Sequence, residues 1–255
     1  LLENLTPEHQ HGDIVVAFVP DEEIGLNGAK ALDLNRFDVD FAWTIDCCEL
    51  GEIVYENFNA AAAEIRFTGV TAHPMSAKGV LVNPLLMATD FISHFDRQQT
   101  PECTEGREGY VWFNGIQAGQ NEAVLKANIR DFDKAQFAAR KQQIADVAAL
   151  IAGQHPTAKV EYRIEDTYSN ISNAIGEDRR AIDLMFEAMK SLGITPKPTP
   201  MRGGTDGAAL SAKGLLTPNF FTGAHNFHSK FEFLPLSSFD ASYNTALQLC
   251  LLAAR

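Results

Sequence analysis

Residues 108–132, "EGYVWFNGIQAGQNEAVLKANIRDF", contain two stretches rich in β-branched and aromatic residues that follow one another directly. Each stretch predicts a β-strand. Helical patterns flank the pair at 83–95 and 134–154, and further strand patterns lie outside them at 61–69 and 158–168. The predicted order of elements is therefore strand, helix, strand, strand, helix, strand.

This β-α-β-β-α-β order is typical of a ferredoxin-like α+β domain. The alternating apolar positions of its strands suit a sheet that helices cover on one face. The other face, or an edge strand, is then free to pair with another copy of the chain.

The sequence on either side of this α+β domain predicts a second domain of a different class. Apolar runs at 14–19 and 41–45 enclose a short helical pattern, and this strand, helix, strand order is the signature of an α/β domain. We therefore predict an α/β domain formed by residues 1–57 and 171–255, interrupted by an inserted α+β domain at 58–170.

Composition excludes several classes of protein. The formal charge of -12, with no basic cluster, argues against a nucleic-acid partner. No apolar run is long enough to span a membrane, and the start of the chain does not resemble a signal peptide. Four cysteines, two of them adjacent, do not form the spaced framework of a small secreted protein, so we expect a cytoplasmic location.

Acidic and imidazole side chains follow the predicted strands of the outer domain, where α/β folds place their ligand sites. Neighbouring carboxylates beside a core repel one another and are costly to desolvate, so a positive partner is expected. A bound zinc ion would remove that repulsion. The candidate residues are Asp21, Glu22, Glu23, Asp46, His225 and His228.

Each of these residues also has an ordinary structural interpretation. "PDEEIG" can be an acidic turn in which Asp21 caps a helix, and Glu22 and Glu23 favour its positive N-terminal end. Asp46 after a strand is a weak signal alone, and His225 and His228 can be a loop pair. The combination of motifs, in this order, is more informative than any one of them.

Five motifs, "PDEEIG", "TIDCCELGE", "GVTAHP", "RGGTDG" and "HSKFE", resemble those of the dizinc metallopeptidase family, which includes aminopeptidases, carboxypeptidases and aminoacylases. The resemblance covers nearly the whole chain and is greatest to tripeptide aminopeptidases. It implies a partial zinc-peptidase catalytic domain, a lid domain that forms a homodimer, two zinc ions per complete active site and a small peptide substrate. The alternatives are a related carboxypeptidase or N-acyl amino acid hydrolase, or a non-catalytic dimerising fragment.

The resemblance also implies roles for individual residues. Glu22 matches the general base, and Glu23 matches the zinc ligand that follows it. Asp46 matches a ligand of the other zinc. His228 matches the last ligand, because an acid, Glu232, follows it four positions later. His225 has no such acid, so we interpret it either as a residue that contacts a metal ligand without binding the metal or as incidental.

In the lid, His73 matches a histidine that reaches the active site of the partner subunit and stabilises the oxyanion. Its alternative is a loop histidine held before a proline. Arg202 and Arg130 match basic residues that hold the carboxylate end of the peptide, a role that suits a guanidinium. Arg130, on a predicted strand, can equally be a surface charge.

The chain departs from the family pattern after the zinc-binding aspartate, where Cys47 and Cys48 replace small residues. We interpret them as small hydrophobic filling, and a thiolate that competes for zinc is the alternative.

A second departure concerns the ligands that the family carries upstream of its general base. Only His9 and His11 precede Asp21, without the required acid. Glu23, Asp46 and His228 remain, and three ligands divided between two metals do not close a dinuclear site. We therefore expect the chain to be the C-terminal part of the enzyme, inactive alone.

Overall fold

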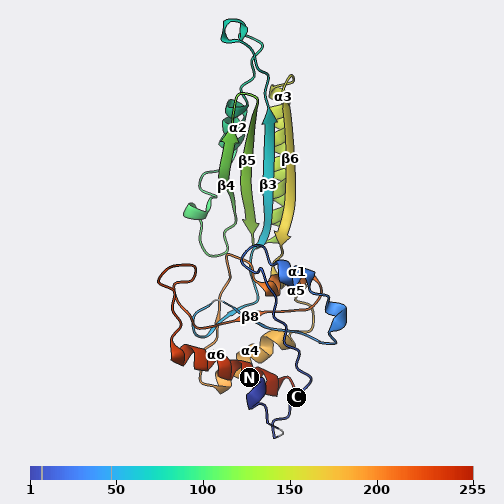
Figure 1. Cartoon of the computed structure of the whole chain (residues 1–255), viewed down its shortest axis with the longest axis vertical. Helices are drawn as coiled ribbons and strands as arrows, with labels where there is room; N and C mark the ends of the chain where they lie inside the picture. Colours follow the sequence, from blue (N-terminus) through green and yellow to red (C-terminus); the bar gives the residue numbers. More distant parts are fainter. Residues whose placement is uncertain (7, 47, 255) are drawn as a thin grey trace. The chain divides into compact units, whose positions relative to one another are not determined.

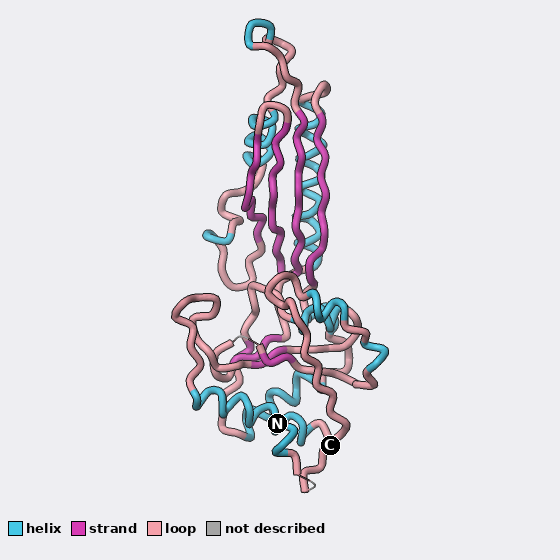
Figure 2. Tube along the Cα trace, in the orientation of Figure 1, coloured by secondary structure: helices cyan, strands magenta, loops and turns pink. Residues whose placement is uncertain are grey.

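The chain folds into two compact units, and unit 2 is inserted between the two segments of unit 1 (Figures 1 and 2). Unit 1 is Leu1–Asn57 with Ser169–Arg255, and unit 2 is Phe58–Tyr168. The mixed α/β fold class predicted from the sequence is confirmed by two sheets with accompanying helices. The computed structural model describes residues 1–6, 8–46 and 48–254.

Unit 2 contains a four-stranded sheet with the order β4-β5-β3-β6, in which every neighbouring pair is antiparallel. The two central strands, β5 and β3, are those whose inward residues are most completely buried. Its strands are β3 (Asn59–Thr68), β4 (Tyr110–Ala118), β5 (Glu122–Asp131) and β6 (Lys159–Tyr168).

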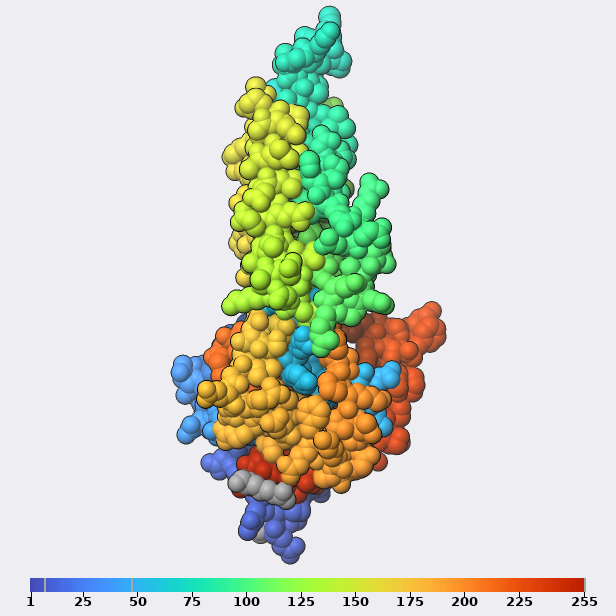
Figure 3. Space-filling model, turned by 180° about the vertical axis from the view of Figure 1, so that it is seen from behind, coloured from blue at the N-terminus to red at the C-terminus, as the bar shows by residue number. Residues whose placement is uncertain are grey.

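Two helices, α2 (Pro84–Ser93) and α3 (Lys134–Gln154), cover one face of this sheet, as the view from behind shows (Figure 3). Each begins at a side-chain cap. Asn83 accepts a hydrogen bond from the Leu85 amide at 3.0 Å, and Asp133 accepts one from the Gln136 amide at 2.8 Å. The core between helices and sheet includes Ile65, Phe67, Met87, Phe91, Leu125, Ile129, Ile144 and Ile151.

The opposite face of the sheet carries charged side chains that pair across and along the strands. Arg66 on β3 lies 2.6 Å from Glu122 on β5 and 3.2 Å from Glu64 on its own strand. This division explains the alternating pattern of the strands, because one face packs against helices and the other faces water.

Unit 1 has a sheet of four short strands in the order β1-β8-β2-β7. Helices α4 (Arg180–Ser191) and α6 (Leu236–Leu252) pack on each other and enclose a core with β2 and β8. Helices α1 (Asn27–Ala31) and α5 (Asp206–Ala212) form a second contact. The strands are β1 (Thr44–Ile45), β2 (Glu52–Val54), β7 (Lys197–Pro198) and β8 (Asn219–Phe220).

Five short 3-10 turns complete the described elements, and none of the described helices is both long and apolar enough to cross a membrane. The turns are η1 (Leu2–Asn4), η2 (Leu34–Arg36), η3 (Pro74–Ser76), η4 (Pro101–Cys103) and η5 (Ile171–Ala174).

The structure corrects two of the strands predicted for unit 1. Residues 14–19 form no strand, and the strand predicted at 41–45 is reduced to β1. Val15, Val16 and Phe18 are exposed, so this apolar run is not covered by the described chain. A strand needs a hydrogen-bonding neighbour as well as a suitable sequence, and the first of these segments has none here.

Candidate metal and catalytic site

The acidic turn stands before helix α1 rather than at its first turn. The Glu22 carbonyl accepts hydrogen bonds from the amides of Gly25 (3.2 Å) and Leu26 (2.9 Å), and the helix begins only at Asn27. Asp21 has a left-handed φ of 63°, and its carbonyl accepts a hydrogen bond from the Asn27 amide at 3.2 Å, but α1 has no side-chain capping bond. The acids therefore form a turn of their own, and the helix-cap interpretation of "PDEEIG" does not apply.

Contacts on either side hold this turn in place. The Gly28 amide donates to the Pro20 carbonyl at 3.1 Å, and a β-carbon on Gly28 would lie 2.4 Å from that oxygen, so the contact requires glycine. Lys213, after α5, donates through Nζ to the carbonyls of Lys30 (3.0 Å) and Leu32 at the end of α1. The turn and helix α1 are thereby attached to the end of α5.

Glu22 is half-buried among other acids. Its pKa is raised from 4.5 to about 7, first by burial and then by the charges of Asp46, Glu23 and Asp206, while His228 lowers it. These four side chains are thus close enough to act on the Glu22 carboxyl group. A carboxyl with a pKa near neutrality can both accept and return a proton at physiological pH.

Asp206 is a member of this group that the sequence analysis missed. It is the first residue of α5, and its Oδ1 is buried without a hydrogen-bond partner among the described residues. Burial raises the pKa of Asp206, and the charge of Asp46 raises it further. The sequence does hold a signal for Asp206, because this acid follows "GGT" directly in the motif "RGGTDG", which also contains Arg202.

His228 meets the acidic turn. Its Nε2 lies 3.4 Å from Oε1 of Glu23, and both side chains are exposed. The His228 backbone has a left-handed φ of 61°, and its amide donates to the Glu232 carboxylate at 2.9 Å. The acid four positions after the histidine therefore holds the loop that presents it.

His225 is engaged elsewhere. Its Nδ1 lies 3.1 Å from Oε1 of Glu49, and its ring stacks on Phe233 with centroids 5.2 Å apart. The backbones of His225 and Phe233 exchange two hydrogen bonds, of 2.9 and 3.2 Å. Of the two histidines, the structure places His228 against the acidic turn.

Asp46 follows β1, and its carbonyl accepts a hydrogen bond from Asn219 Nδ2 at 2.9 Å. Cys48 is buried in the core of unit 1, with its Sγ 3.8 Å from the same amide nitrogen. This packing favours the filling role for Cys48. Cys47, the other half of that hypothesis, lies outside the described residues.

The donor set for a metal is incomplete in the part of the chain that the structure describes, where no group of three His, Cys, Asp or Glu side chains is arranged to hold an ion. Glu23 and His228 supply two converging donors, and the repulsion that raises the pKa of Glu22 is what a cation would relieve. A zinc site needs at least three protein ligands. The described residues therefore do not form a complete zinc site by themselves.

Arg202 lies in the loop that leads to α5. Met201 beside it donates its amide to the Glu56 carbonyl at 3.0 Å, and Asn57 Nδ2 donates to the Gly203 carbonyl at 3.3 Å. Glu56 and Asn57, at the end of the first segment of unit 1, therefore hold the loop that carries Arg202. Arg202 is four residues before Asp206 in the sequence.

His73 and Arg130 belong to unit 2. His73 is exposed in the loop between Val70 and Val82, and its Nδ1 accepts a hydrogen bond from the Met75 amide at 3.2 Å. This bond caps η3.

The Arg130 guanidinium is half-buried and packs within unit 2. Nη1 donates to the carbonyls of Ala61 (3.1 Å) and Ile129 (2.9 Å), and the group lies 5.5 Å from the centre of the Tyr168 ring. A solvated surface charge is therefore not an adequate description of Arg130.

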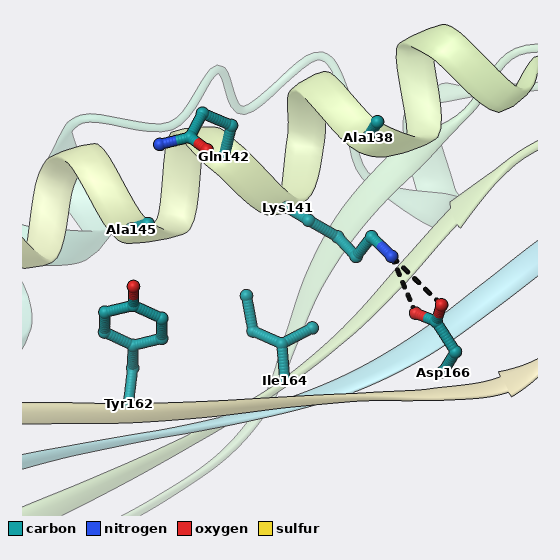
Figure 4. A pocket seen from close by; sticks show the side chains of 7 residues that line it. All are labelled: Ala138, Lys141, Gln142, Ala145, Tyr162, Ile164 and Asp166. Atoms are coloured by element: carbon teal, nitrogen blue, oxygen red, sulfur yellow. Dashed lines mark hydrogen bonds and ion pairs between the residues drawn. The ribbon is translucent and has the colours of Figure 1, made fainter.

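An open hollow of about 500 Å³ lies between α3 and β6 (Figure 4). Lys141 Nζ bridges both carboxylate oxygens of Asp166 there, at 2.8 and 3.1 Å, and Tyr162 and Ile164 point toward the helix. No residue predicted for the active site lines this hollow.

The sequence profile of the family described as the peptidase dimerisation domain matches residues 55–159. A peptidase T-like protein of Yersinia pestis is 69 % identical over the whole chain, and one of Rhizobium meliloti is 62 % identical over 254 residues. The peptidase T of Aeromonas hydrophila is 43 % identical over 95 % of the chain and 60 % of its own length. The chain is thus similar to peptidase T-like proteins and carries a match to the peptidase dimerisation domain, and it spans 62 % of the length of the two peptidase T-like relatives.

Solved structures share the fold. A Staphylococcus aureus tripeptidase matches with a TM-score of 0.79 at 23 % identity, over 92 % of this chain and 62 % of its own. The Bacillus cereus aminopeptidase PepT matches with a TM-score of 0.80 at 19 % identity, with the same coverage. A dinuclear metal-binding M20 peptidase of Bacillus subtilis matches with a TM-score of 0.70 at 19 % identity, over 92 % of this chain and 63 % of its own.

Proposed function

We propose that this chain is part of a cytoplasmic dizinc aminopeptidase that removes the N-terminal residue from tripeptides. The observation that carries the proposal is Glu22, whose pKa is raised to about 7 among Asp46, Glu23 and Asp206 with His228 beside them. The names of the relatives support the reaction, because several are peptidase T and one fold neighbour is a tripeptidase.

Glu22 is the proposed general base, which takes a proton from the attacking water and returns it to the leaving amine. Glu23, Asp46 and His228 are the proposed zinc ligands. Zinc, when bound, would supply Lewis-acid polarisation of the scissile carbonyl and of the water. The contact between His228 and Glu23 supports this assignment over one that uses His225.

We propose that Arg202 and Arg130 bind the free carboxylate of the peptide and thereby select substrates of a fixed short length. His73 is proposed to reach the active site of the partner subunit in a homodimer, where it stabilises the oxyanion. The proposal includes a division into domains. Residues 1–57 and 171–255 form the partial catalytic domain, and residues 58–170 form the lid and dimerisation domain. The family match at 55–159 supports the last assignment.

A hybrid protein tests the reaction, because the chain spans only part of its relatives. In this hybrid, the chain replaces the matching part of the Yersinia pestis relative. We expect the hybrid to bind two zinc ions and to cleave tripeptides in preference to dipeptides and N-acyl amino acids. Glu22→Gln should lower kcat by at least about a hundredfold, since it removes the proton acceptor. Glu177→Gln, at an exposed acid, is the matched control.

Hydrolysis of N-acyl amino acids without tripeptides would instead support the related acylase or carboxypeptidase. A second candidate is a non-catalytic dimerising fragment. The observation that supports this candidate is the incomplete set of metal donors among the described residues. Metal analysis of the chain alone addresses it, because two zinc ions per chain would contradict the partial-site interpretation. A hybrid that neither binds zinc nor cleaves any of these substrates would overturn the proposed function.

A further inference from the structure

Asn219, on β8 (Figure 1), is a completely buried polar residue of unit 1, with 0 % of its surface exposed. β8 runs parallel to β1, and the register places Asn219 opposite Thr44, two positions before Asp46. Burying an amide group costs free energy unless the group forms hydrogen bonds. Its Nδ2 donates to the Asp46 carbonyl at 2.9 Å, so the buried amide holds the backbone just beyond the end of β1.

The backbone that follows Asp46 adopts an unfavourable conformation. β1 ends at Ile45, and Cys48 has a left-handed φ of 70°, which glycine adopts far more readily than other residues. Such a conformation persists only where surrounding contacts impose it. Asn219 supplies one of these contacts, and the Gly223 amide supplies another by donating to the Cys48 carbonyl at 3.0 Å. The segment that runs through β8 therefore holds the turn that carries Asp46.

Cys48 affects the direction in which the Asn219 amide points. Its Sγ lies 3.8 Å from Nδ2, and the residue is 8 % exposed. A thiol sulfur is a weak hydrogen-bond acceptor, so Nδ2 faces two acceptors, this sulfur and the Asp46 carbonyl oxygen. Rotating the amide by half a turn would place Oδ1, which cannot donate, against both of them. Cys48 therefore favours the orientation that holds Asp46, a role that requires no contact between the thiol and a metal.

We propose that Asn219 is a positioning residue for Asp46, and that Cys48 orients the Asn219 amide for this role. The part of the proposal that concerns metal rests on the proposed function, in which Asp46 is a zinc ligand, whereas the hydrogen bond to the turn does not. Removing a group that orients a metal ligand commonly weakens metal binding roughly tenfold to a hundredfold. Asp46 also lies close enough to Glu22 for its charge to act on that carboxyl, so displacing Asp46 would disturb the proposed general base as well.

Asn59 offers a matched control in unit 2. It is 3 % exposed, and its Nδ2 donates to the carbonyls of Asp131 (3.1 Å) and Phe132 (3.0 Å). Asn59 therefore makes the same kind of contact, from a buried amide to backbone oxygens, and it is not one of the proposed site residues. Replacing either asparagine with alanine should destabilise the chain, because a backbone carbonyl loses its donor. Only Asn219→Ala should change metal binding.

Zinc affinity in the hybrid with the Yersinia pestis relative tests the positioning role. In competition with a chelator, Asn219→Ala should raise the zinc Kd roughly tenfold to a hundredfold, and Asn59→Ala should change it less than about threefold. Asn219→Ser, whose shorter side chain does not span the distance to the Asp46 carbonyl, is the second variant if the alanine variant does not fold, and the same rise is expected. An unchanged Kd in a folded Asn219 variant would overturn the proposal.

Hydrogen exchange in the chain alone tests the contact without zinc. The Gly223 amide reports on the turn through its bond to the Cys48 carbonyl, and the amides of α6 report on the folding of unit 1. Asn219→Ala should accelerate exchange at Gly223 at least about tenfold more than exchange in α6. Equal acceleration at Gly223 and in α6 would show only a loss of global stability and would contradict the proposed contact.

A double-mutant cycle tests the role of Cys48. If Cys48 acts through Asn219, Cys48→Ala should raise the zinc Kd of the hybrid, and the double variant should bind zinc no more weakly than Asn219→Ala alone. If the thiolate is instead a zinc ligand, the two effects should multiply, and that outcome would reject the orienting role.

The positioning role and the proposed function fail in different ways. An unsubstituted hybrid that neither binds zinc nor cleaves tripeptides would reject the proposed function, and exchange at Gly223 would still decide whether Asn219 holds the turn. A zinc-binding hybrid whose Kd does not respond to Asn219→Ala would leave the proposed function in place and reject the positioning role.

Discussion

Glu22 shows how burial and neighbouring charges change the pKa of a single residue. Burial and the charges of three other acids hold its pKa at about 7, against only one opposing contribution, from His228. The protonated carboxyl is therefore favoured in the folded chain to a far higher pH than in an unfolded one. That property is useful for proton transfer and costly for stability.

Because ionised Glu22 lowers the stability of the folded chain, Glu22→Gln should raise the free energy of unfolding in a pH-dependent way. The folded pKa lies above the unfolded value of 4.5, so Glu22 lowers stability progressively as pH rises from about 4.5 to about 7, and fully above that. Urea unfolding should show Glu22→Gln about 1 kcal/mol more stable at pH 8, a figure reduced for partial exposure, with no difference at pH 4. A gain of the same size at both pH values would contradict this explanation.

At the scale of elements, helix α3 is tied to the sheet of unit 2 by two ion pairs with different surroundings. Arg140 Nε lies 2.8 Å from Asp131 Oδ2, with side chains 15 % and 7 % exposed. Lys141 Nζ lies 2.8 Å from Asp166 Oδ1, with side chains 27 % and 61 % exposed. The lengths are equal, so burial decides what each pair contributes.

Removing one carboxylate from each pair should therefore have unequal effects. Asp131→Ala leaves the largely buried Arg140 without its carboxylate, with the Gln99 Oε1 at 2.7 Å as a neutral partner, and should cost about 3 kcal/mol of unfolding free energy. Asp166→Ala should cost less than about 1 kcal/mol, because Lys141 can reach water. Urea denaturation of both variants measures the difference, and equal losses would show that burial is not the deciding factor.

At the scale of the whole molecule, unit 2 is the part that is complete in itself. One continuous segment forms it, and its first and last strands pair directly, with Ala60 opposite Tyr168. Its core is closed between sheet and helices. Such a segment has the features of an independently folding domain.

We therefore expect the excised segment 58–168 to unfold in one cooperative transition, followed by circular dichroism. Phe91→Ala, at a fully buried position, should lower its stability by about 3–4 kcal/mol, whereas Met75→Ala, in the exposed loop, should change it little. A gradual, non-cooperative melt of the segment would show that it depends on the rest of the chain.

Prediction from the sequence was successful where the pattern is local. The strand and helix order of unit 2 follows from hydrophobic periodicity, and the structure shows it. The strand predicted at 14–19 is wrong for this chain, because strand formation needs partners that its sequence does not specify. Glu22 and Glu23 are identified by motif. Asp206 also lies in one of the quoted motifs, but its burial beside the other acids depends on packing that the motif does not show.

The sequence by itself determined the mixed α/β fold, the order of elements in unit 2 and the candidate acids, because periodicity and motif are written in neighbouring residues. Only the tertiary structure decided that His228 rather than His225 faces Glu23, that Asp206 joins the acids and that residues 13–19 remain uncovered. These outcomes depend on contacts between segments far apart in the chain, which local pattern does not encode.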